Sequence, residues 1–235
     1  MIVAAFRPET FVDAVRFIGD NVGFLATKAL EQLELSGAAL GLALLVALPL
    51  GITLGHFHRG SSIAIGMSNF ARALPVLAAI GFLLPIFGIG FRTNGIALAI
   101  LASGPILINA YDGIDGIDRD AVDAARGMGM TGTQVLGRIE LPLALPLLFA
   151  GIRVAAVTVV ATAPIAAYAG GGGLGDVIAN QASYRFAGVL GASLCVMALS
   201  TAVFLALIAI QQAVTPRGVR RTRVLGDVPP GKELQ

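Results

Sequence analysis

The sequence predicts an all-helical membrane protein with about five transmembrane helices. The chain has 235 residues, of which 56% are hydrophobic and 13% charged, and its mean hydropathy is +0.85. A soluble domain carries roughly 25% charged residues, so this chain cannot cover its surface with polar groups in water. The apolar segments are predicted to be helices, because open strands cannot satisfy their backbone hydrogen bonds in lipid. The 30 glycines suit helices that pack backbone to backbone.

Five apolar segments approach the length of about 20 residues that a helix needs to cross the hydrocarbon layer. They are residues 35–55, 63–90, 95–110, 142–168 and 188–210. The second is long and contains Arg72 and Pro75, so it is predicted to tilt or kink. The third is shorter, and we expect Gly104-Pro105 to break it.

The segment before the first span does not read as a secretory signal, because Arg7 and Glu9 interrupt it early. Phe11, Val15 and Ile18 recur at helical spacing. They predict a short amphipathic helix that either lies on the membrane surface or packs on the spans.

Three regions are therefore expected. They are an external amphipathic segment (residues 1–31), a transmembrane domain (residues 32–213) and a disordered cytoplasmic tail (residues 214–235).

The distribution of arginines predicts the orientation of the spans. Eight arginines follow spans one, three and five, whereas the loops on the other side hold only Arg92 and Arg185, with three more cations in the leading segment. Cytoplasmic loops carry the excess of Lys and Arg, so the N-terminus is predicted outside and the C-terminus inside.

Residues 112–141, called the insert below, are polar and broken by glycines, and they lie between the third and fourth spans. Ala124 and Ala125 favour a helix, whereas Gly129 and its neighbouring glycines interrupt it. Thr131 and Gln134 match a capping box, which predicts that a second short helix begins there. The insert is thus predicted to be a helix, a glycine turn and a helix on the cytoplasmic side.

The spacing of the insert resembles the EAA loop of the permeases of ABC importers. Asp123-Ala124-Ala125, Gly129 and Ile139-x-Leu141-Pro142 fall in register, with Asp in the place where the family usually has Glu. The stretches Glu140-Leu-Pro-Leu-Ala-Leu-Pro146 and Gly171-Gly-Gly-Leu-Gly175 resemble the osmoprotectant branch of that family. The resemblance covers roughly residues 33–210.

This resemblance implies a type I importer permease in the bacterial plasma membrane, whose pathway carries glycine betaine, choline, carnitine or proline. The seven motif residues named above would meet an ABC ATPase dimer, which would bind ATP and magnesium, so no cofactor is expected in this chain. A second permease chain, identical or homologous, and a separate extracytoplasmic solute-binding protein are the other implied partners. Nucleic acid is not suggested by a net charge of only +2.

Two other motifs resemble a nucleotide site and a metal site, but neither interpretation is favoured. Gly170-x-Gly172-x-x-Gly175 matches the dinucleotide fingerprint formally, but it follows an apolar span where the fingerprint needs a strand. His56 and His58 are the only histidines, and they favour an interfacial anchor over a metal site. No catalytic set lies at membrane depth, which argues against an intramembrane enzyme. The resemblance likewise implies a transport subunit and not an enzyme.

Three polar residues within the spans are candidates for the pathway: Arg72, Asn109 and Arg153. A charge in hydrocarbon is costly, so each arginine either lines the pathway, pairs within the bundle or extends to the interface. The chain has no tryptophan, so high-affinity recognition of a quaternary ammonium is expected in the receptor.

Other functions remain open at this point. One is an importer permease for methionine, another amino acid or an oxyanion. A less favoured alternative is a secondary transporter that works alone, which should show inverted repeats and carboxylates at mid-membrane.

Overall fold

A computed structural model describes residues 8–58 and 60–214, and all of their regular elements are helical. The transmembrane part is built on α2 (Val22–His56), α5 (Phe91–Asp115), α8 (Leu141–Thr162) and α10 (Gln181–Val214). Four helices are long and apolar enough to cross a membrane, and a fifth span results if the bent pair α3 (Ser61–Ala73) and α4 (Val76–Phe87) counts as one. The predicted fold class is therefore confirmed.

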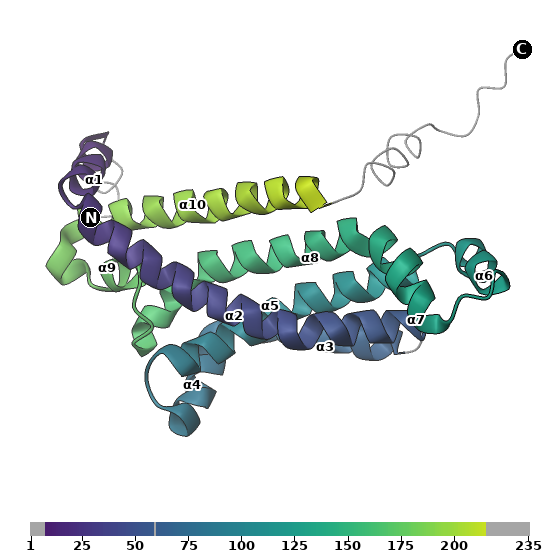
Figure 1. Ribbon diagram of the computed structural model, residues 1–235. Helices are drawn as coiled ribbons and strands as arrows, with labels where there is room; N and C mark the ends of the chain where they lie inside the picture. Colours follow the sequence, from purple (N-terminus) through teal and green to yellow (C-terminus); the bar gives the residue numbers. More distant parts are fainter. Residues whose placement is uncertain (1–7, 59, 215–235) are drawn as a thin grey trace, which may run out of the picture.

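The central helix of the bundle is α5, which packs against α2, α3 and α8 (Figure 1). Glycines bring the helix backbones close together. A Cβ atom on Gly51 would lie 2.7 Å from the Leu107 carbonyl oxygen, and one on Gly151 would lie 2.8 Å from that of Pro105. The main core lies between α2, α5 and α8 and is rich in alanine. Close packing of small residues is how helices associate where lipid removes the hydrophobic driving force.

Pro75 breaks the second predicted span more sharply than expected. Leu74 is extended (φ −71°, ψ 117°), and α3 and α4 meet at 89°. Proline disfavours the helical conformation of the residue before it and has no N–H for the helix ladder. Each half is too short to cross about 30 Å of hydrocarbon alone.

The expected break at Gly104-Pro105 is wrong, because α5 continues through both residues. Both are buried, and the Ser68 hydroxyl of α3 donates a hydrogen bond to the Gly104 carbonyl oxygen at 3.0 Å. Packing on several sides holds the helix together despite the missing N–H of the proline, as occurs in membrane helices.

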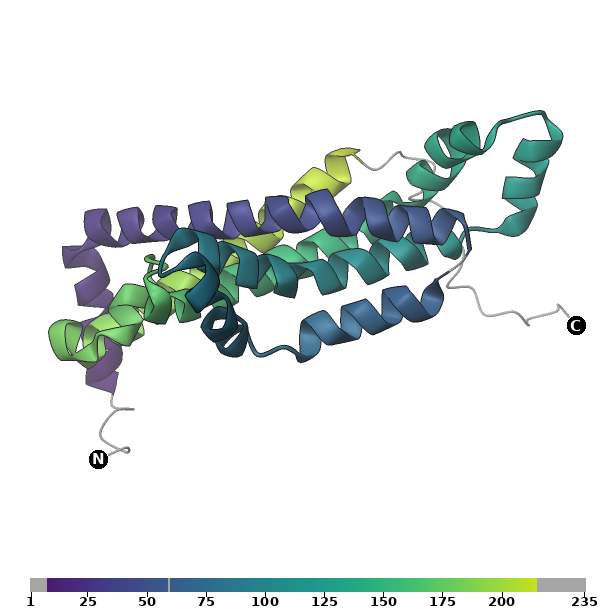
Figure 2. The same ribbon diagram turned by 90° about the horizontal axis from the view of Figure 1, so that it is seen from below.

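At one end of the bundle lie α1 (Pro8–Asp20) and α9 (Gly175–Ala179), and at the other end lies the insert (Figures 1 and 2). The short helix α1 packs on α10: Ala14 is fully buried there, whereas Phe11 and Val15 are exposed. This favours the packed interpretation for one face of α1. Helix α2 begins at Val22, so residues 22–31 of the predicted external segment are continuous with the first span. The predicted tail lies outside the described residues, apart from Val214.

Candidate functional site

The insert forms an arm that projects beyond the bundle (Figure 2). Its first helix, α6 (Arg119–Gly127), is capped by Asp118, whose side chain accepts a hydrogen bond from the Asp120 backbone N–H at 3.0 Å. Helix α7 (Gly132–Val135) begins at the predicted capping box, in which the Thr131 N–H donates to the Gln134 side chain at 2.9 Å. These two caps satisfy backbone groups that the helix starts leave unpaired.

The second helix of the insert is not separate from the following span, which corrects the sequence interpretation. It continues through a π-turn (Leu136–Glu140) directly into α8. The Leu141 N–H donates to the Leu136 carbonyl oxygen, so one extra residue is accommodated just before Pro142. Such a π-turn tolerates a proline that would otherwise break the helix ladder. The arm is therefore a direct extension of α8.

The residues of the EAA-like motif divide between the surface and a small core. Asp123, Ala124 and Gly129 are exposed. Ala125 is only 1% exposed and packs with Val122 and Val135, and Ile139 lies against this cluster. Leu141 and Pro142 are half-buried where the arm joins α8. Two alanines that look equivalent in the sequence thus face opposite ways.

Gly129 forms the turn at the tip of the arm. Its φ is +83°, in the left-handed region that glycine adopts without steric cost. Its N–H donates to the Arg126 carbonyl oxygen at 2.9 Å, and the Met130 N–H donates to that of Ala125 at 3.2 Å. Beside it, the Met128 side chain is 77% exposed. A flexible apolar side chain and an open backbone at the end of a rigid arm are suited to contact another protein.

The two histidines join the end of α2 to both ends of the insert. His56 Nδ1 lies 2.5 Å from Glu140 Oε2, and His58 Nδ1 lies 2.7 Å from Asp115 Oδ1. Sequence reasoning missed these pairs, because the partners are 84 and 57 residues apart. Neither histidine belongs to a group of three or more metal-ligating side chains in the described part of the chain.

Comparison with known proteins assigns the family. Residues 47–221 match the family model described as "Binding-protein-dependent transport system inner membrane component". This match covers well over half of the chain. The chain belongs to this family. It is the permease of an ABC importer, a transport component rather than an enzyme, and ATP is hydrolysed on a partner ATPase.

Three curated permeases are similar to this one over most of its length. The glycine betaine/carnitine/choline transport system permease protein OpuCB of Bacillus subtilis is 35% identical, over 87% of this chain and 94% of its own. The carnitine transport permease protein OpuCB of Listeria monocytogenes is 36% identical, over 91% and 98%. The osmoprotectant import permease protein OsmW of Salmonella typhimurium is 32% identical, over 89% and 100%.

The permease also shares its fold with a solved structure, that of the MetNI methionine ABC transporter in inward-facing conformations. The TM-score is 0.72 over 82% of this chain and 96% of the other, at 23% sequence identity. A likeness at this identity concerns the fold alone.

The three pathway candidates of the permease have different surroundings. Arg72 is exposed at the end of α3 and donates to the Asn69 side chain at 3.0 Å. Asn109 donates to the Pro105 carbonyl oxygen of its own helix at 2.8 Å. Arg153 donates to Gln211 of α10 at 3.0 Å and lies over the Phe204 ring at 5.5 Å. The structure does not bring these residues together at one point.

At the end of the permease opposite the insert, a charged network fastens the glycine-rich turn to α2. Lys28 Nζ lies 2.9 Å from Glu31 Oε2 and 2.8 Å from Asp176 Oδ2. The Gly173 N–H donates to Glu31 Oε2 at 3.0 Å. The sequence analysis did not anticipate this network, because Lys28 and Asp176 are 148 residues apart.

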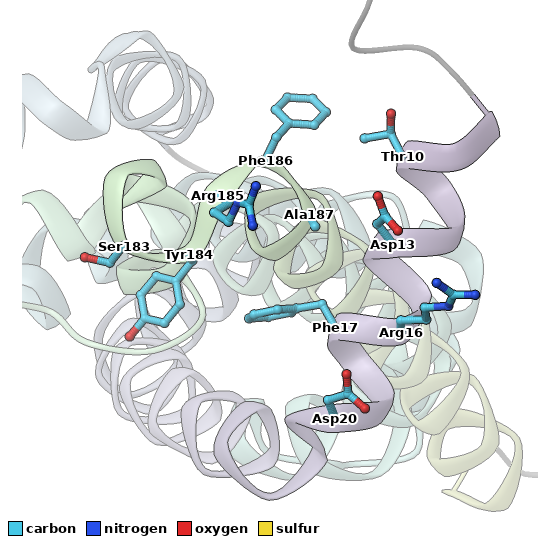
Figure 3. Close-up of a pocket in the computed structure, with 10 residues that line it drawn as sticks. All are labelled: Thr10, Asp13, Arg16, Phe17, Asp20, Ser183, Tyr184, Arg185, Phe186 and Ala187. Carbon is cyan, nitrogen blue, oxygen red and sulfur yellow. The ribbon is translucent and has the colours of Figure 1, made fainter.

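A cavity of about 570 Å³ opens at the same end of the permease, between α1 and the start of α10 (Figure 3). Phe17 extends from α1 toward Tyr184, and their ring centroids are 6.4 Å apart. Both charge signs surround the cavity, with Asp13 on α1 and Arg185 opposite. Arg185 has φ +56° and ψ 179°, a backbone conformation that residues other than glycine rarely adopt.

Proposed function

We propose that this permease forms the translocation pathway for an osmoprotectant such as glycine betaine, choline, carnitine or proline. The observation that carries the proposal is the set of curated relatives whose names specify such solutes, at 32–36% identity over 87–91% of this chain. An importer for methionine is the second candidate. It is favoured only by a shared fold at 23% identity, which says little about the solute.

In this proposal the exposed tip of the insert docks on an ABC ATPase dimer. Asp123, Ala124 and Gly129 face outward there, next to the exposed Met128. Ala125 and Ile139 act from within, by holding the arm rigid around Val122 and Val135. Leu141 and Pro142 lie where the arm joins α8, so a movement of the tip passes directly into a membrane helix.

A second permease chain, identical or homologous, completes the pathway. The face that α3 and α4 present to the surroundings is rich in exposed apolar side chains, such as Met67, Phe70, Phe82 and Ile86. Arg72 lies beside this face. Because a charge at mid-membrane needs water or a partner, we place Arg72 at a water-filled pathway between the two chains. Asn109 is the second pathway candidate, whereas Arg153 serves to hold α10 against α8.

The proposed orientation places the insert in the cytoplasm and α1 outside. Arg119, Arg126 and Arg138 all lie in the insert, as expected of a cytoplasmic segment. The opposite end carries α1, α9 and the cavity of Figure 3, and a separate solute-binding protein docks there in this proposal.

Uptake by the reconstituted complex tests the solute. The permease is purified with its ATPase and receptor, placed in proteoliposomes with internal ATP, and supplied with labelled glycine betaine, choline, carnitine, proline or methionine. The proposal predicts ATP-dependent uptake of at least one of the first four solutes. Uptake of methionine alone would assign the complex to the second candidate.

A further inference from the structure

We propose that His56 and His58 form a clamp that fixes both ends of the insert to the cytoplasmic end of α2. This inference rests on the proposed function of the insert as the ATPase contact. The clamp consists of two pairs, His56 with Glu140 and His58 with Asp115. These are the only two histidines of the chain, and they lie two residues apart.

The positions of the two carboxylates are what makes the pairs a clamp. Asp115 is the last residue of α5, immediately before the chain enters the arm. Glu140 is the last residue of the π-turn, immediately before α8 begins. One short segment at the end of α2 therefore holds the chain where it leaves the bundle and where it returns.

The pair of His56 and Glu140, called the inner pair, is largely shielded from water, so the two side chains must stay in contact. Glu140 is only 1% exposed, and the His56 side chain is 14% exposed. A buried carboxylate without a partner is strongly destabilising, so the position of Glu140 depends on His56. A Cβ atom on Gly132 would lie 3.7 Å from His56 Nε2, so the same ring also lies beside the first residue of α7. His56 thus positions the second helix of the insert as well as its end.

The part of α2 that carries the clamp is itself packed tightly on α5. A Cβ atom on Gly55 would lie 2.8 Å from Ile114 Cβ and 2.9 Å from the Tyr111 carbonyl oxygen. The end of α2 cannot move far from α5 without losing this packing. Since α8 continues from the arm, the clamp makes the arm, α2, α5 and α8 move as one block. His56 and His58 are therefore positioning residues for the transfer of movement from the ATPase.

The experiment measures solute imported per ATP hydrolysed in proteoliposomes that contain the permease, its ATPase and its receptor. The variants are His56→Ala, His58→Ala, His56→Ala with Glu140→Ala, and His58→Lys. We expect each single alanine variant to lower this ratio about tenfold while ATP hydrolysis continues, because the arm then moves without moving α2, α5 and α8. His58→Lys should restore most of the ratio, since a lysine can pair with Asp115.

Removal of both inner partners should be less harmful than His56→Ala alone, because no carboxylate is left buried without a partner.

Asp112→Asn is the matched control. This carboxylate is exposed, lies one turn before Asp115 on α5, and has no hydrogen-bond partner among the described residues, so the ratio should stay within about twofold.

An unchanged ratio in both single alanine variants, with the complex intact, would overturn the clamp. If His56→Ala does not accumulate in the membrane, the more exposed pair of His58 and Asp115 decides the question alone. The parent complex separates this outcome from a failure of the proposed function. If the parent shows no ATP-dependent uptake, the proposed function is wrong. If the parent and the variants import the same amount of solute per ATP hydrolysed, only the clamp is contradicted.

Discussion

At the scale of single residues, the tip of the insert favours a glycine for two reasons: its backbone conformation and, in the proposed function, the close approach of a partner. The left-handed backbone at Gly129 (φ +83°) favours glycine, with asparagine the best alternative. A Cβ atom there would meet nothing within 4 Å in this chain. An added side chain therefore meets no steric clash, and asparagine keeps the cost of the left-handed backbone small. A loss of activity much larger than this backbone strain would point to a partner that approaches the backbone closely.

Gly129→Asn is accordingly predicted to insert normally and to lower uptake by roughly tenfold or more, the scale of a lost interface hot spot. The measurement is uptake and receptor-stimulated ATP hydrolysis in proteoliposomes with equal amounts of permease. Gly19→Asn is the control, since Gly19 is exposed and equally open but lies on α1 at the opposite end. Parental activity of the Gly129 variant would remove the tip from the ATPase contact.

Arg72 provides a second residue-scale prediction, on the pathway. Glycine betaine and carnitine carry a carboxylate, whereas choline does not. Arg72→Gln is therefore predicted to raise the KM for glycine betaine about tenfold, as expected for the loss of a charge-assisted hydrogen bond, and to leave that for choline within twofold. Arg92→Gln, at the start of α5 and away from the insert, serves as the control. Equal changes for both solutes would place Arg72 outside the solute path.

At the scale of elements, the packing of α2 on α5 holds the bundle together where the insert attaches. Gly51 and Gly55 are four residues apart on α2, and both lie against the α5 backbone. Such a spacing puts both glycines on one helix face, so two backbones can approach closely. Side chains added at these positions have no space to enter.

Gly55→Val is predicted to destabilise the permease by about 1–3 kcal/mol or more, the usual effect of overpacking. Thermal unfolding of the detergent-purified chain measures this, together with its yield from membranes. Gly41→Val is a matched control on the same helix, because a Cβ atom on Gly41 meets nothing within 4 Å. A stable Gly55 variant, or equal loss in both variants, would contradict the close approach of α2 and α5.

The prolines show how far the elements could be predicted from the sequence. Pro75, Pro105 and Pro142 have the same local chemistry but different outcomes: a right-angled break, an intact buried helix and a π-turn. Packing decides among these, because α5 is surrounded by other helices and the junction of α3 and α4 is not. The local sequence shows that a proline tends to break a helix. It does not show which helices pack around that proline and hold the helix together.

The candidate site was predictable only where its signal is local. The capping box at Thr131 and the glycine turn at Gly129 depend on residues close in sequence, and the structure shows both. The two histidine–carboxylate pairs and the Lys28–Asp176 pair could not be found in this way. Their partners come from different helices, so only the folded bundle brings them together.

At the scale of the whole molecule, the insert and the cavity of Figure 3 lie at opposite ends of the bundle (Figure 1). The charge distribution predicts that the insert is cytoplasmic. In a Cys195→Ser background, which has no other cysteine, Met128→Cys should react with a membrane-impermeant maleimide only after the cells are opened. Asn180→Cys, at the exposed end of α9, should react in intact cells. The reverse pattern would invert the proposed orientation.

The central claim is that a separate ATPase drives this permease through the insert. The most direct measurement is solute uptake by proteoliposomes that contain the permease either alone or with its ATPase and receptor, each with and without ATP. We predict uptake only from the full complex with ATP, and its loss in the Gly129→Asn variant. Uptake by the permease alone, or unchanged ATP-driven uptake in that variant, would contradict the claim.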